Sequence, residues 1–422
     1  MIKKVKFKQT PIGKIPKEWE VVNLDDVAYI NKASIDPTKE LLDKKFFYID
    51  IDSVENGTGA IKDTKEIIGR NAPSRARRVI HYNDILMSTV RPYLRAFTIV
   101  PQKLNKQICS TGFAVLTCKE SLHPLYLLYS ILSKFVIDQC NKMMVGGQYP
   151  ALSASQVKQI KILLPPVPEQ KKIAEVLSTV DSAIQKVNEA IENSQRLKKG
   201  LMQELLTKGI GHDVKAYRDT PPIGKIPKEW AVVKLGDISL DLLGGGTPST
   251  SDTNYWNGNI PWMTSAFINR REVNAGQKYI TKEGLKGSAA NLIPKENLLI
   301  ATRVGIGKAA LNRIDIAISQ DLTGVIVNKN KALPDYLYWF FINSKEKLKS
   351  LAQGSTIKGI LRDDLSKIKL PLPPLHEQNK IAEILSSVDE KLELLRVRKE
   401  KFTRLKNGLM NELLTGKKRV KV

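Results

Sequence analysis

The chain has 422 residues, 42% of them apolar and 26% charged, which is the composition of a globular protein of two or three domains. No window of 18 apolar residues occurs and the opening stretch MIKKVKFKQTPIG has no apolar core, so we expect neither a membrane span nor a secretory signal. Cys109, Cys118 and Cys140 show no CxxC spacing, which excludes a disulfide framework and favours reduced thiols in a cytoplasmic protein.

A nine-residue stretch, PIGKIPKEW, stands at residues 11–19 and returns letter for letter at 222–230. Each copy is followed by a Val-Val pair that predicts a strand. Trp19 and Trp230 close the two copies, and we expect them to anchor the stretch in the core; docking of a partner is the alternative. The repeat indicates two tandem units of about 210 residues each.

The first predicted body covers residues 25–160 and mixes strands with a helix. Runs of β-branched and aromatic residues predict strands within 46–54, 77–90 and 96–100. An amphipathic helix is expected at 124–140, followed by a glycine loop at 145–149. Three prolines then lead into a long segment without proline.

Residues 169–207 predict one long helix, because their apolar residues alternate at intervals of four and three, as in a coiled-coil seam. A second copy at 377–415 aligns without a gap and shares 21 of 39 letters, ten of them in 169–181 and ten in 196–207. One apolar stripe needs a partner, so we expect the two helices to pack antiparallel about a pseudo-twofold axis. An ordinary duplicated bundle helix is the alternative.

A polar linker at 208–220 joins the first unit to a second body at 236–368, which repeats the plan with different letters. The predicted fold class is therefore α+β: two globular α/β-mixed bodies separated by two long antiparallel coiled-coil helices, in a pseudo-twofold tandem repeat. The expected domains are a first body at 1–160, a first spacer helix at 161–210, a second body at 211–368, and a second spacer helix with a basic tail at 369–422.

The formal net charge of +24 lies almost entirely outside the two predicted helices. Those helices carry 14 Lys and Arg against 13 Asp and Glu. Basic bodies and nearly neutral helices indicate a polyanion partner for the bodies and protein partners for the helices. A generally lysine-rich proteome is the alternative, although it leaves the neutral helices unexplained.

Motifs for catalysis are missing from the sequence. GIGK at 305–308 lacks the spacing of a phosphate-binding loop, and His376-Glu377 lacks the second histidine of a zinc protease. The four histidines and three cysteines show no metal-ligand spacing. Two variant bodies on a repeated helical frame favour a binding protein over an enzyme.

The order of these motifs resembles the specificity subunit of type I restriction–modification systems. The resemblance spans the whole chain. It is carried by the LPP(V/L)xEQxxIAExLSxVD segments at 164–181 and 372–389, the KxGLMxELLT ends at 198–207 and 406–415, the IGKIPKEW stretches, and GGGTPS with TRVGIGK in the second body. The first body departs from the pattern, with STVRPYLRA at 88–96 where the second has ATRVGIGKA.

The resemblance implies that each body is a target-recognition domain that reads one half of a bipartite double-stranded DNA site. It also implies that the helices separate the bodies like a ruler, and that methylation subunits, two in number, and restriction subunits are the protein partners. The chain itself would be non-catalytic and without a cofactor. S-adenosylmethionine would belong to the methylation subunits, and ATP and magnesium to the restriction subunits.

Candidate DNA contacts follow from charge and from position in predicted loops. Arg75, Arg77 and Arg78 form a basic cluster that fits either a phosphate contact or a solvated edge. The other candidates are contacts to base edges or grooves, because arginine and glutamine reach guanine and adenine edges in bidentate fashion. In the first body they are Thr89, Arg91, Tyr93, Arg95, Gln148 and Tyr149. In the second body they are Arg270, Arg271, Thr302, Arg303, Lys308, Ser355 and Thr356, whereas Trp262 is expected in the core.

Two other functions remain open on the sequence. A stand-alone bivalent DNA-binding regulator would need no partner enzyme, and tight specific binding by the purified protein would favour it. A single-chain methyltransferase or nuclease is the third possibility, against which the missing motifs argue.

Overall fold

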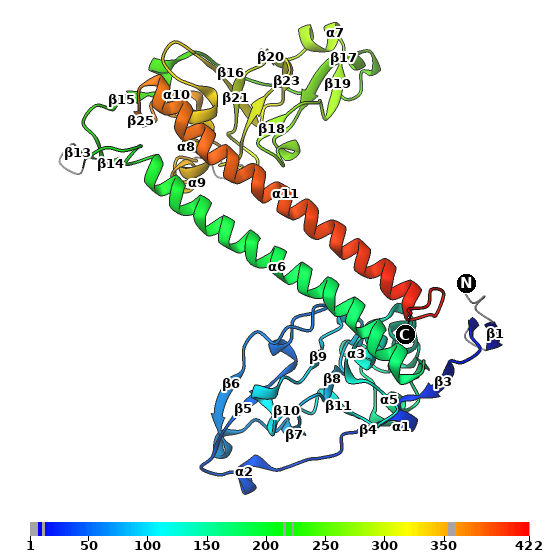
Figure 1. The fold of residues 1–422 in the computed structure, drawn as a ribbon. Helices are drawn as coiled ribbons and strands as arrows, with labels where there is room; N and C mark the ends of the chain where they lie inside the picture. The colour runs from blue at the N-terminus through cyan, green and yellow to red at the C-terminus, as the bar shows by residue number, and fades with distance from the viewer. Residues whose placement is uncertain (1–6, 11–12, 214–216, 222, 353–358, 422) are drawn as a thin grey trace. The chain divides into compact units, whose positions relative to one another are not determined.

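The structure, a computed structural model, describes residues 7–10, 13–213, 217–221, 223–352 and 359–421. The chain forms two compact units: unit 1 takes residues 1–188 and 397–422, and unit 2 takes residues 189–396. Two helices of 39 residues each, α6 (Val167–Leu205) and α11 (Leu375–Leu413), contribute a part to each unit (Figure 1). The predicted α+β class with two mixed bodies and two long helices is confirmed, and the helix bounds differ from the prediction by two residues at each end.

Two four-stranded sheets form the body of unit 1. Their strand orders are β6-β5-β10-β7 and β4-β11-β8-β9, with only the β5–β10 pair parallel among the described strands. The strands are β4 (Ala28–Ile30), β5 (Lys45–Ile49), β6 (Lys65–Ile68), β7 (Ala76–Ile80), β8 (Ile85–Ser88), β9 (Phe97–Ile99), β10 (Gln107–Ser110) and β11 (Phe113–Cys118). Short helical turns join them: α1 (Leu24–Val27), α2 (Pro37–Glu40), η1 (Ile51–Ser53), η2 (Gly69–Asn71), η3 (Pro92–Leu94) and η4 (Gln102–Leu104).

The helix expected at 124–140 is in fact two helices, α3 (Pro124–Leu132) and α4 (Lys134–Met143). The chain breaks at Ser133, whose hydroxyl accepts a hydrogen bond from the Val136 amide and caps α4. A short helix, α5 (Ala154–Lys158), leads to β12 (Lys161–Leu164), which pairs antiparallel with β3 (Glu20–Asn23) directly before α6 begins.

Unit 2 repeats this plan and adds one strand, β18, at the edge of its second sheet. Its sheets have the orders β19-β17-β23-β20 and β16-β24-β21-β22-β18, so β21 and β22 correspond to β8 and β9. The strands are β16 (Ser239–Gly244), β17 (Trp256–Met263), β18 (Glu272–Val273), β19 (Lys278–Ile280), β20 (Asn291–Ile293), β21 (Asn297–Ala301), β22 (Ala309–Asn312), β23 (Ile316–Ile318) and β24 (Leu322–Val327), with β15 (Ala231–Lys234) pairing β25 (Lys369–Leu372) as β3 pairs β12. The shorter helices are η6 (Leu235–Ile238), η7 (Thr253–Tyr255), η8 (Ser265–Phe267), α7 (Lys282–Lys286), α8 (Pro334–Asn343), α9 (Lys345–Ser350) and α10 (Arg362–Ser366).

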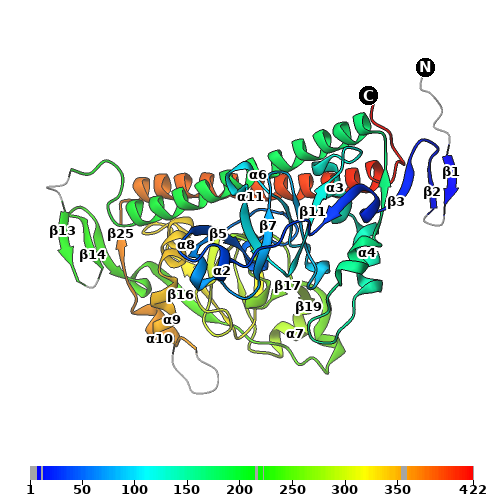
Figure 2. The ribbon, with the colours of Figure 1, turned by 90° about the horizontal axis from the view of Figure 1, so that it is seen from below.

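A two-stranded hairpin precedes each body. The pair β1 (Phe7–Thr10) and β2 (Gly13–Pro16) lies near the C-terminal segment of unit 1, where Gly416 approaches Pro16 (Figure 2). The pair β13 (Tyr217–Thr220) and β14 (Gly224–Pro227) lies beside β25 in unit 2 (Figure 2).

Trp19 and Trp230 anchor the two repeated stretches, as the sequence predicts. Their exposed fractions are 0% and 1%, and each indole nitrogen donates to a buried glutamate at 3.0 Å, Trp19 to Glu169 and Trp230 to Glu377. The next residue of each long helix repeats the pattern, because Gln170 accepts from the His123 amide and Gln378 accepts from the Leu333 amide, both at 2.8 Å. The letters Glu-Gln at the start of each helix are therefore explained by the body that packs on them.

Within each unit the helix segments run antiparallel and are joined by a partly buried ion pair. In unit 1 Lys406 of α11 contacts Asp181 of α6 at 2.6 Å, and in unit 2 Lys198 of α6 contacts Asp389 of α11 at 2.5 Å. The two ion pairs use equivalent positions of the repeat with the two helices interchanged. This is the relation expected of a pseudo-twofold axis.

A single glycine interrupts each long helix in its last turns, Gly200 in α6 and Gly408 in α11. Glycine in a helix interior lowers helix stability by about 1 kcal/mol relative to alanine. A Cβ placed at either position would meet nothing in the described chain within 4 Å. Packing inside the protein therefore does not require these glycines.

Within the described residues, no helix is both long enough and apolar enough to cross a membrane.

Candidate nucleic-acid interface

The body of each unit places a hairpin loop at the same point of its sheet. In unit 1 the loop joins β8 to β9, and the Thr89 amide donates to the Gly112 carbonyl at 2.8 Å while the Thr89 carbonyl accepts from Leu152. In unit 2 the loop joins β21 to β22, and Thr302 makes the same two contacts with Asp321 and Ile360. The segments 88–96 and 301–309, which the sequence aligns in spite of different letters, are thus structurally equivalent.

The loop of unit 1 contains two arginines in an unusual backbone conformation. Arg91 and Arg95 have φ of 46° and 57°, in the left-handed region that costs a non-glycine residue about 1–2 kcal/mol. The Arg91 guanidinium lies over the Tyr149 ring, 4.8 Å from its centroid, and donates to the Gln148 carbonyl at 3.0 Å. Strain of this kind gathers at functional sites, where the surroundings hold it in place.

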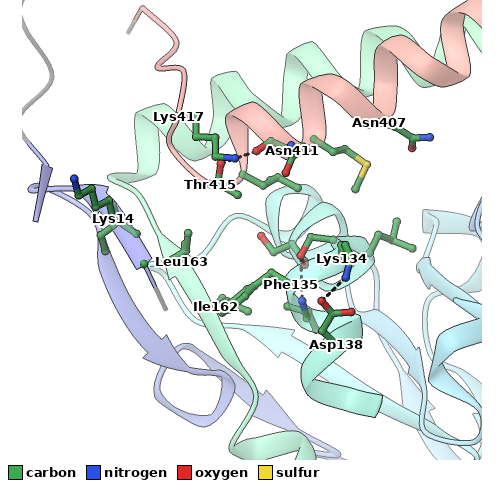
Figure 3. A pocket seen from close by; sticks show the side chains of 18 of the residues that line it. Lys14, Lys134, Phe135, Asp138, Ile162, Leu163, Asn407, Asn411, Thr415 and Lys417 are labelled. Atoms are coloured by element: carbon green, nitrogen blue, oxygen red, sulfur yellow. Dashed lines mark hydrogen bonds and ion pairs between the residues drawn. The ribbon is translucent and has the colours of Figure 1, made fainter. Parts of the chain in front are cut away.

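The structure therefore brings most of the unit 1 candidates together. Tyr93, Gln148 and Tyr149 are exposed beside Arg91, whereas the Thr89 hydroxyl already donates to Gly112 at 2.9 Å. Arg95 turns toward a different neighbourhood: it lines a hollow bordered by α4 and the end of α11, part of which Figure 3 shows. Its position favours a contact outside the loop cluster.

The three arginines of the basic cluster at 75–78 have different contacts. Arg75 is exposed, and its carbonyl accepts from the Thr111 amide, which places it next to the Gly112 contact of the hairpin loop. Arg77 is bound to Asp36 at 2.8 Å. Arg78 is partly buried, and its Nε has no hydrogen-bond partner. Arg75 is the member of the cluster that lies at the loops.

The loop of unit 2 gains its shape from glycines instead. Gly305 and Gly307 have φ of 73° and 92°, and between Thr302 and Ala309 the side chains of Arg303 and Lys308 are exposed. Thr302 is only 4% exposed, and its hydroxyl lies 3.2 Å from that of Thr323, so it lies in the core. The candidates Ser355 and Thr356 fall outside the described residues.

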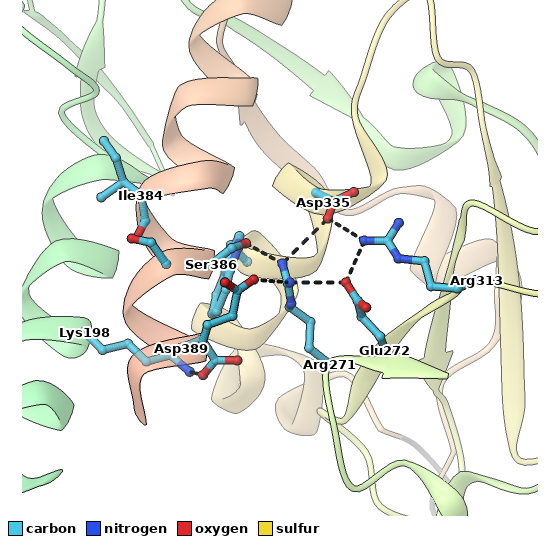
Figure 4. A network of polar contacts seen from close by, with 11 residues as sticks. Lys198, Arg271, Glu272, Arg313, Asp335, Ile384, Ser386 and Asp389 are labelled. Atoms are coloured by element: carbon cyan, nitrogen blue, oxygen red, sulfur yellow. Dashed lines mark hydrogen bonds and ion pairs between the residues drawn. The ribbon is translucent and has the colours of Figure 1, made fainter. Parts of the chain in front are cut away.

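The two candidate arginines that directly precede β18 have different environments. Arg270 is exposed, whereas Arg271 lies in a polar network that ties the body to α11 (Figure 4). Arg271 contacts Glu272 at 3.1 Å and Glu390 at 3.2 Å, and donates to the Ser386 hydroxyl. Its charge is therefore engaged within the protein.

Arg313 completes the network by binding Glu272 at 2.8 Å, Glu296 at 2.9 Å and Asp335 at 3.1 Å. The hydrogen bond from Arg313 lowers the pKa of Glu272, although partial burial opposes the shift. Burial disfavours the charged form of Arg313, yet the hydrogen bond and charge of Glu272 and the charge of Asp335 raise its pKa. The network thus fixes charged groups of both signs, and leaves little for a ligand to bind.

Sequence reasoning missed several polar residues around the unit 2 loop. Gln320 and Thr247 are hydrogen-bonded to each other at 2.7 Å and exposed, next to the Asp321 carbonyl that holds Thr302. Arg362 is exposed and approaches Gly244. The run GGGTPST and the pair Ser319-Gln320 lie in loops between predicted strands, a signal that would have included Thr247 and Gln320 in the set.

The described residues hold no group of three or more His, Cys, Asp or Glu side chains placed to bind a metal ion. The three cysteines are free, and burial raises the pKa of Cys118 and Cys140 to about 12 and that of Cys109 further still. Thiols with such pKa values remain protonated near neutral pH and are poor nucleophiles.

Comparison with known proteins identifies the family of this chain. The family model of the type I restriction modification DNA specificity domain matches residues 16–193 and 227–404, and each match contains one hairpin loop. The chain belongs to that family. It is a type I specificity subunit with two tandem DNA specificity domains.

Relatives and solved structures agree with this membership. A putative type I restriction enzyme specificity subunit, MjaX, of Methanocaldococcus jannaschii is 30% identical over 99% of this chain and 98% of its own length. The MjaVIII specificity subunit of the same organism is 31% identical over 99% and 97%. A chain from a structural study of complex assembly in the type I restriction–modification system matches with a TM-score of 0.57 at 25% identity, covering 95% of this chain and 99% of that one. The S subunit from M. genitalium, at 14% identity and a TM-score of 0.60, supports the fold alone.

Proposed function

We propose that this specificity subunit reads a bipartite double-stranded DNA site, with one half-site contacted by each unit. The observation that carries the proposal is the equivalence of the two hairpin loops, which occupy the same place in the same frame but differ in almost every letter between Thr89 and Ala96 and between Thr302 and Ala309. A shared frame with different exposed side chains suits two recognition modules with two targets. The net charge of +24, concentrated outside the long helices, supports a polyanionic ligand.

The contacts we assign to DNA are the members of the loop clusters that are exposed or partly exposed. In unit 1 they are Arg75, Arg91, Tyr93, Gln148 and Tyr149. In unit 2 they are Arg270, Arg303, Lys308, Thr247 and Gln320. Thr302 and Arg271 are left out because their polar groups are occupied inside the protein.

We assign the long helices a spacing role. At about 1.5 Å per residue, 39 residues extend about 58 Å, which equals about 17 base pairs at about 3.4 Å per pair. That length is an upper limit for a gap between half-sites bridged by a helix pair. Insertion of four residues within 182–195 should lengthen the gap in the recognised site, and an unchanged gap would contradict the spacing role.

The partners in this proposal are two methylation subunits, which carry S-adenosylmethionine, and restriction subunits, which carry ATP and magnesium. The specificity subunit supplies recognition and no catalytic group. A cytoplasmic location accords with three free cysteines in the chain.

Mapping of methylated adenines across the host genome, with the gene intact and deleted, tests the proposal. We expect the deletion to abolish methylation at one motif, made of two short half-sites around a fixed gap. A purified chain that binds such a site tightly without partner subunits, in a host whose methylation is unchanged by the deletion, would instead support a stand-alone bivalent regulator.

A further inference from the structure

Two exposed apolar side chains stand next to each other at the tip of the unit 1 hairpin loop. Tyr93 and Leu94 are consecutive residues of the short helix η3, and each is 43% exposed. Pro92, the first residue of η3, is buried. Single apolar residues on a surface need no explanation, but two neighbours at the tip of a candidate DNA-binding loop form a patch that another molecule can cover.

Hydrogen bonds tie this turn to the rest of the body at both of its ends. On the N-terminal side the Arg91 amide donates to the Pro150 carbonyl at 2.9 Å. On the C-terminal side the Arg95 carbonyl accepts from the Gly57 amide at 3.0 Å. The backbone that carries the two apolar side chains is therefore ordered before anything binds, which lowers the entropy lost when a partner covers them.

The surroundings of the pair combine further apolar surface with positive charge. In the neighbouring glycine loop Val145 is 72% and Tyr149 66% exposed. The residues directly before and after η3 are Arg91 and Arg95, so a guanidinium group stands on each side of the pair in the chain. Apolar side chains between cations complement DNA, in which the apolar faces of the bases lie between two rows of phosphates.

The equivalent loop of unit 2 presents much less apolar surface. Val304 is 53% exposed there, and it is followed by Gly305. Ile306, the next residue, is only partly exposed. One valine beside a glycine offers a smaller apolar tip than a tyrosine and a leucine together, so the two loops are suited to different contacts with DNA.

We propose that Tyr93 and Leu94 form a wedge that enters between two base pairs of the half-site contacted by unit 1 and kinks the DNA there. The inference rests on the proposed function and adds to it a mode of recognition that unit 2 does not share. Apolar side chains inserted at a base step partly unstack it. Pyrimidine–purine steps, TA and CA/TG, unstack most readily, so insertion favours letters that no side chain has to contact. Unit 1 thereby selects a deformable step.

The first test measures unstacking in the assembled methyltransferase, on duplexes that carry the site found by methylation mapping. 2-Aminopurine, which fluoresces more strongly when it is unstacked, replaces single purines in and beside each half-site, but never the adenine that is methylated. Wild type should raise the fluorescence at one step of the unit 1 half-site and at no step of the other. The double variant Tyr93→Ala/Leu94→Ala should abolish the rise and bind the duplex about 5- to 50-fold more weakly.

A second series changes the base step at which the fluorescence rises. Wild type should bind duplexes with TA or CA/TG at that step more tightly than duplexes with other steps. The double variant should bind all of them alike, because the cost of unstacking no longer enters its affinity.

Leu42→Ala and Tyr82→Ala are the matched controls. Their side chains are 51% and 52% exposed in the same body, outside the hairpin loop. Both variants should leave the fluorescence and the affinity unchanged. Tyr93→Phe combined with Leu94→Met keeps the apolar volume and should retain the rise. All these positions are exposed, so the variants should fold as wild type does.

A unit 1 half-site that stays stacked in the wild-type complex, or a rise that the double variant retains, would overturn the wedge. Weaker binding of the methylation subunit by the double variant without DNA would also overturn it, since the two side chains would then serve a protein contact. A wild-type complex that binds no bipartite site would instead contradict the proposed function.

Discussion

In unit 1 the hairpin loop carries two arginines in the left-handed conformation, and one of them is clamped against Tyr149. In unit 2 the left-handed positions of the equivalent loop are glycines, and the exposed Arg303 and Lys308 have no such stacking contact among the described residues. The two units therefore shape their loops differently on one frame. In unit 1 a strained arginine is held by its surroundings, and in unit 2 glycines take up the left-handed positions without strain.

The units also differ in how the body is tied to the helices. Unit 2 uses the network around Arg271 and Arg313, which reaches Ser386 and Glu390 of α11. In unit 1 the segment around Gly59 lies next to the edge strand β9, where the Thr98 hydroxyl donates to the Gly59 carbonyl at 2.6 Å. Unit 1 has a different arginine contact, in which Arg419 of the C-terminal segment binds Glu169 of α6 and Glu18. The two units share one frame, but the contacts that hold the body against the long helices differ between them.

The equivalence of the frame is tested by the buried tryptophans. Trp19→Ala and Trp230→Ala should each destabilise their own unit by about 3–5 kcal/mol, as is usual for loss of a buried tryptophan. Hydrogen exchange read by mass spectrometry reports the two units separately. We expect equal losses of protection, each confined to the unit that carries the change. Phenylalanine at the same positions removes mainly the hydrogen bond to Glu169 or Glu377 and should cost about 1–3 kcal/mol. Clearly unequal losses would break the equivalence.

The substitution Arg271→Gln tests whether the arginine network holds the second body against α11. The substitution removes the charged partner of Glu390 and leaves Glu272 bound to Arg313 alone, and should destabilise unit 2 by about 1.5–3 kcal/mol. Unit 1 should be unaffected in the same exchange measurement. Arg270→Gln, at the exposed neighbour, is the control and should stay within about 0.5 kcal/mol of wild type. Equal stability of the two variants would mean that the network does not hold the body.

The reading loops are tested by Arg91→Ala and Arg303→Ala in the assembled methyltransferase. A good bidentate base contact contributes about 1–3 kcal/mol, so each variant should bind target DNA about 5- to 150-fold more weakly and tolerate base changes in one half-site only. Competition binding with targets altered in either half-site gives the measurement. Lys103→Ala, an exposed lysine of the first body outside the loops, should leave discrimination unchanged. Loss of discrimination in both half-sites at once would contradict separate reading.

The smallest effect concerns pH and unit 2 alone. The pKa of Glu272 is lowered on folding, so its stabilising contribution is complete above the usual value of 4.5 and is lost as the pH falls through the lower folded value. Glu272→Gln should therefore lower the melting temperature of unit 2 at pH 7, and the difference from wild type should shrink below pH 4.5. A constant difference down to pH 3 would show that ionisation of Glu272 is not the cause.

The frame could be predicted because its letters are repeated. The Glu-Gln pairs, the tryptophans and the Lys198 and Lys406 positions recur at a nearly constant offset, and the structure gives each a matching contact in the two units. The break between α3 and α4 was missed, although Ser133 is a common helix-capping residue, because the apolar pattern continues across it.

The surroundings of the candidate DNA contacts could be predicted less well than the frame, for a physical reason. Loop position and residue type do not tell which way a side chain points, so Thr302 was grouped with its exposed neighbour Arg303 although it lies in the core. The partners of Arg271, Ser386 and Glu390, lie more than 100 residues away in the chain, and no local pattern links them. Gln320 is brought to the loop cluster only by the pairing of β23 and β24 with their neighbours.

The division of the chain between the units affects the order in which they can be completed during synthesis. Unit 2 is one continuous stretch, whereas unit 1 combines the first 188 residues with the last 26. At about 5–20 residues per second, the N-terminal part of unit 1 waits on the order of 10–45 s for its final segment to leave the ribosome. Until then Glu169 lacks Arg419, which holds it through two hydrogen bonds in the finished protein. A premature stop codon near the 3′ end of the gene would therefore damage the unit that is translated first and leave every residue of unit 2 in place.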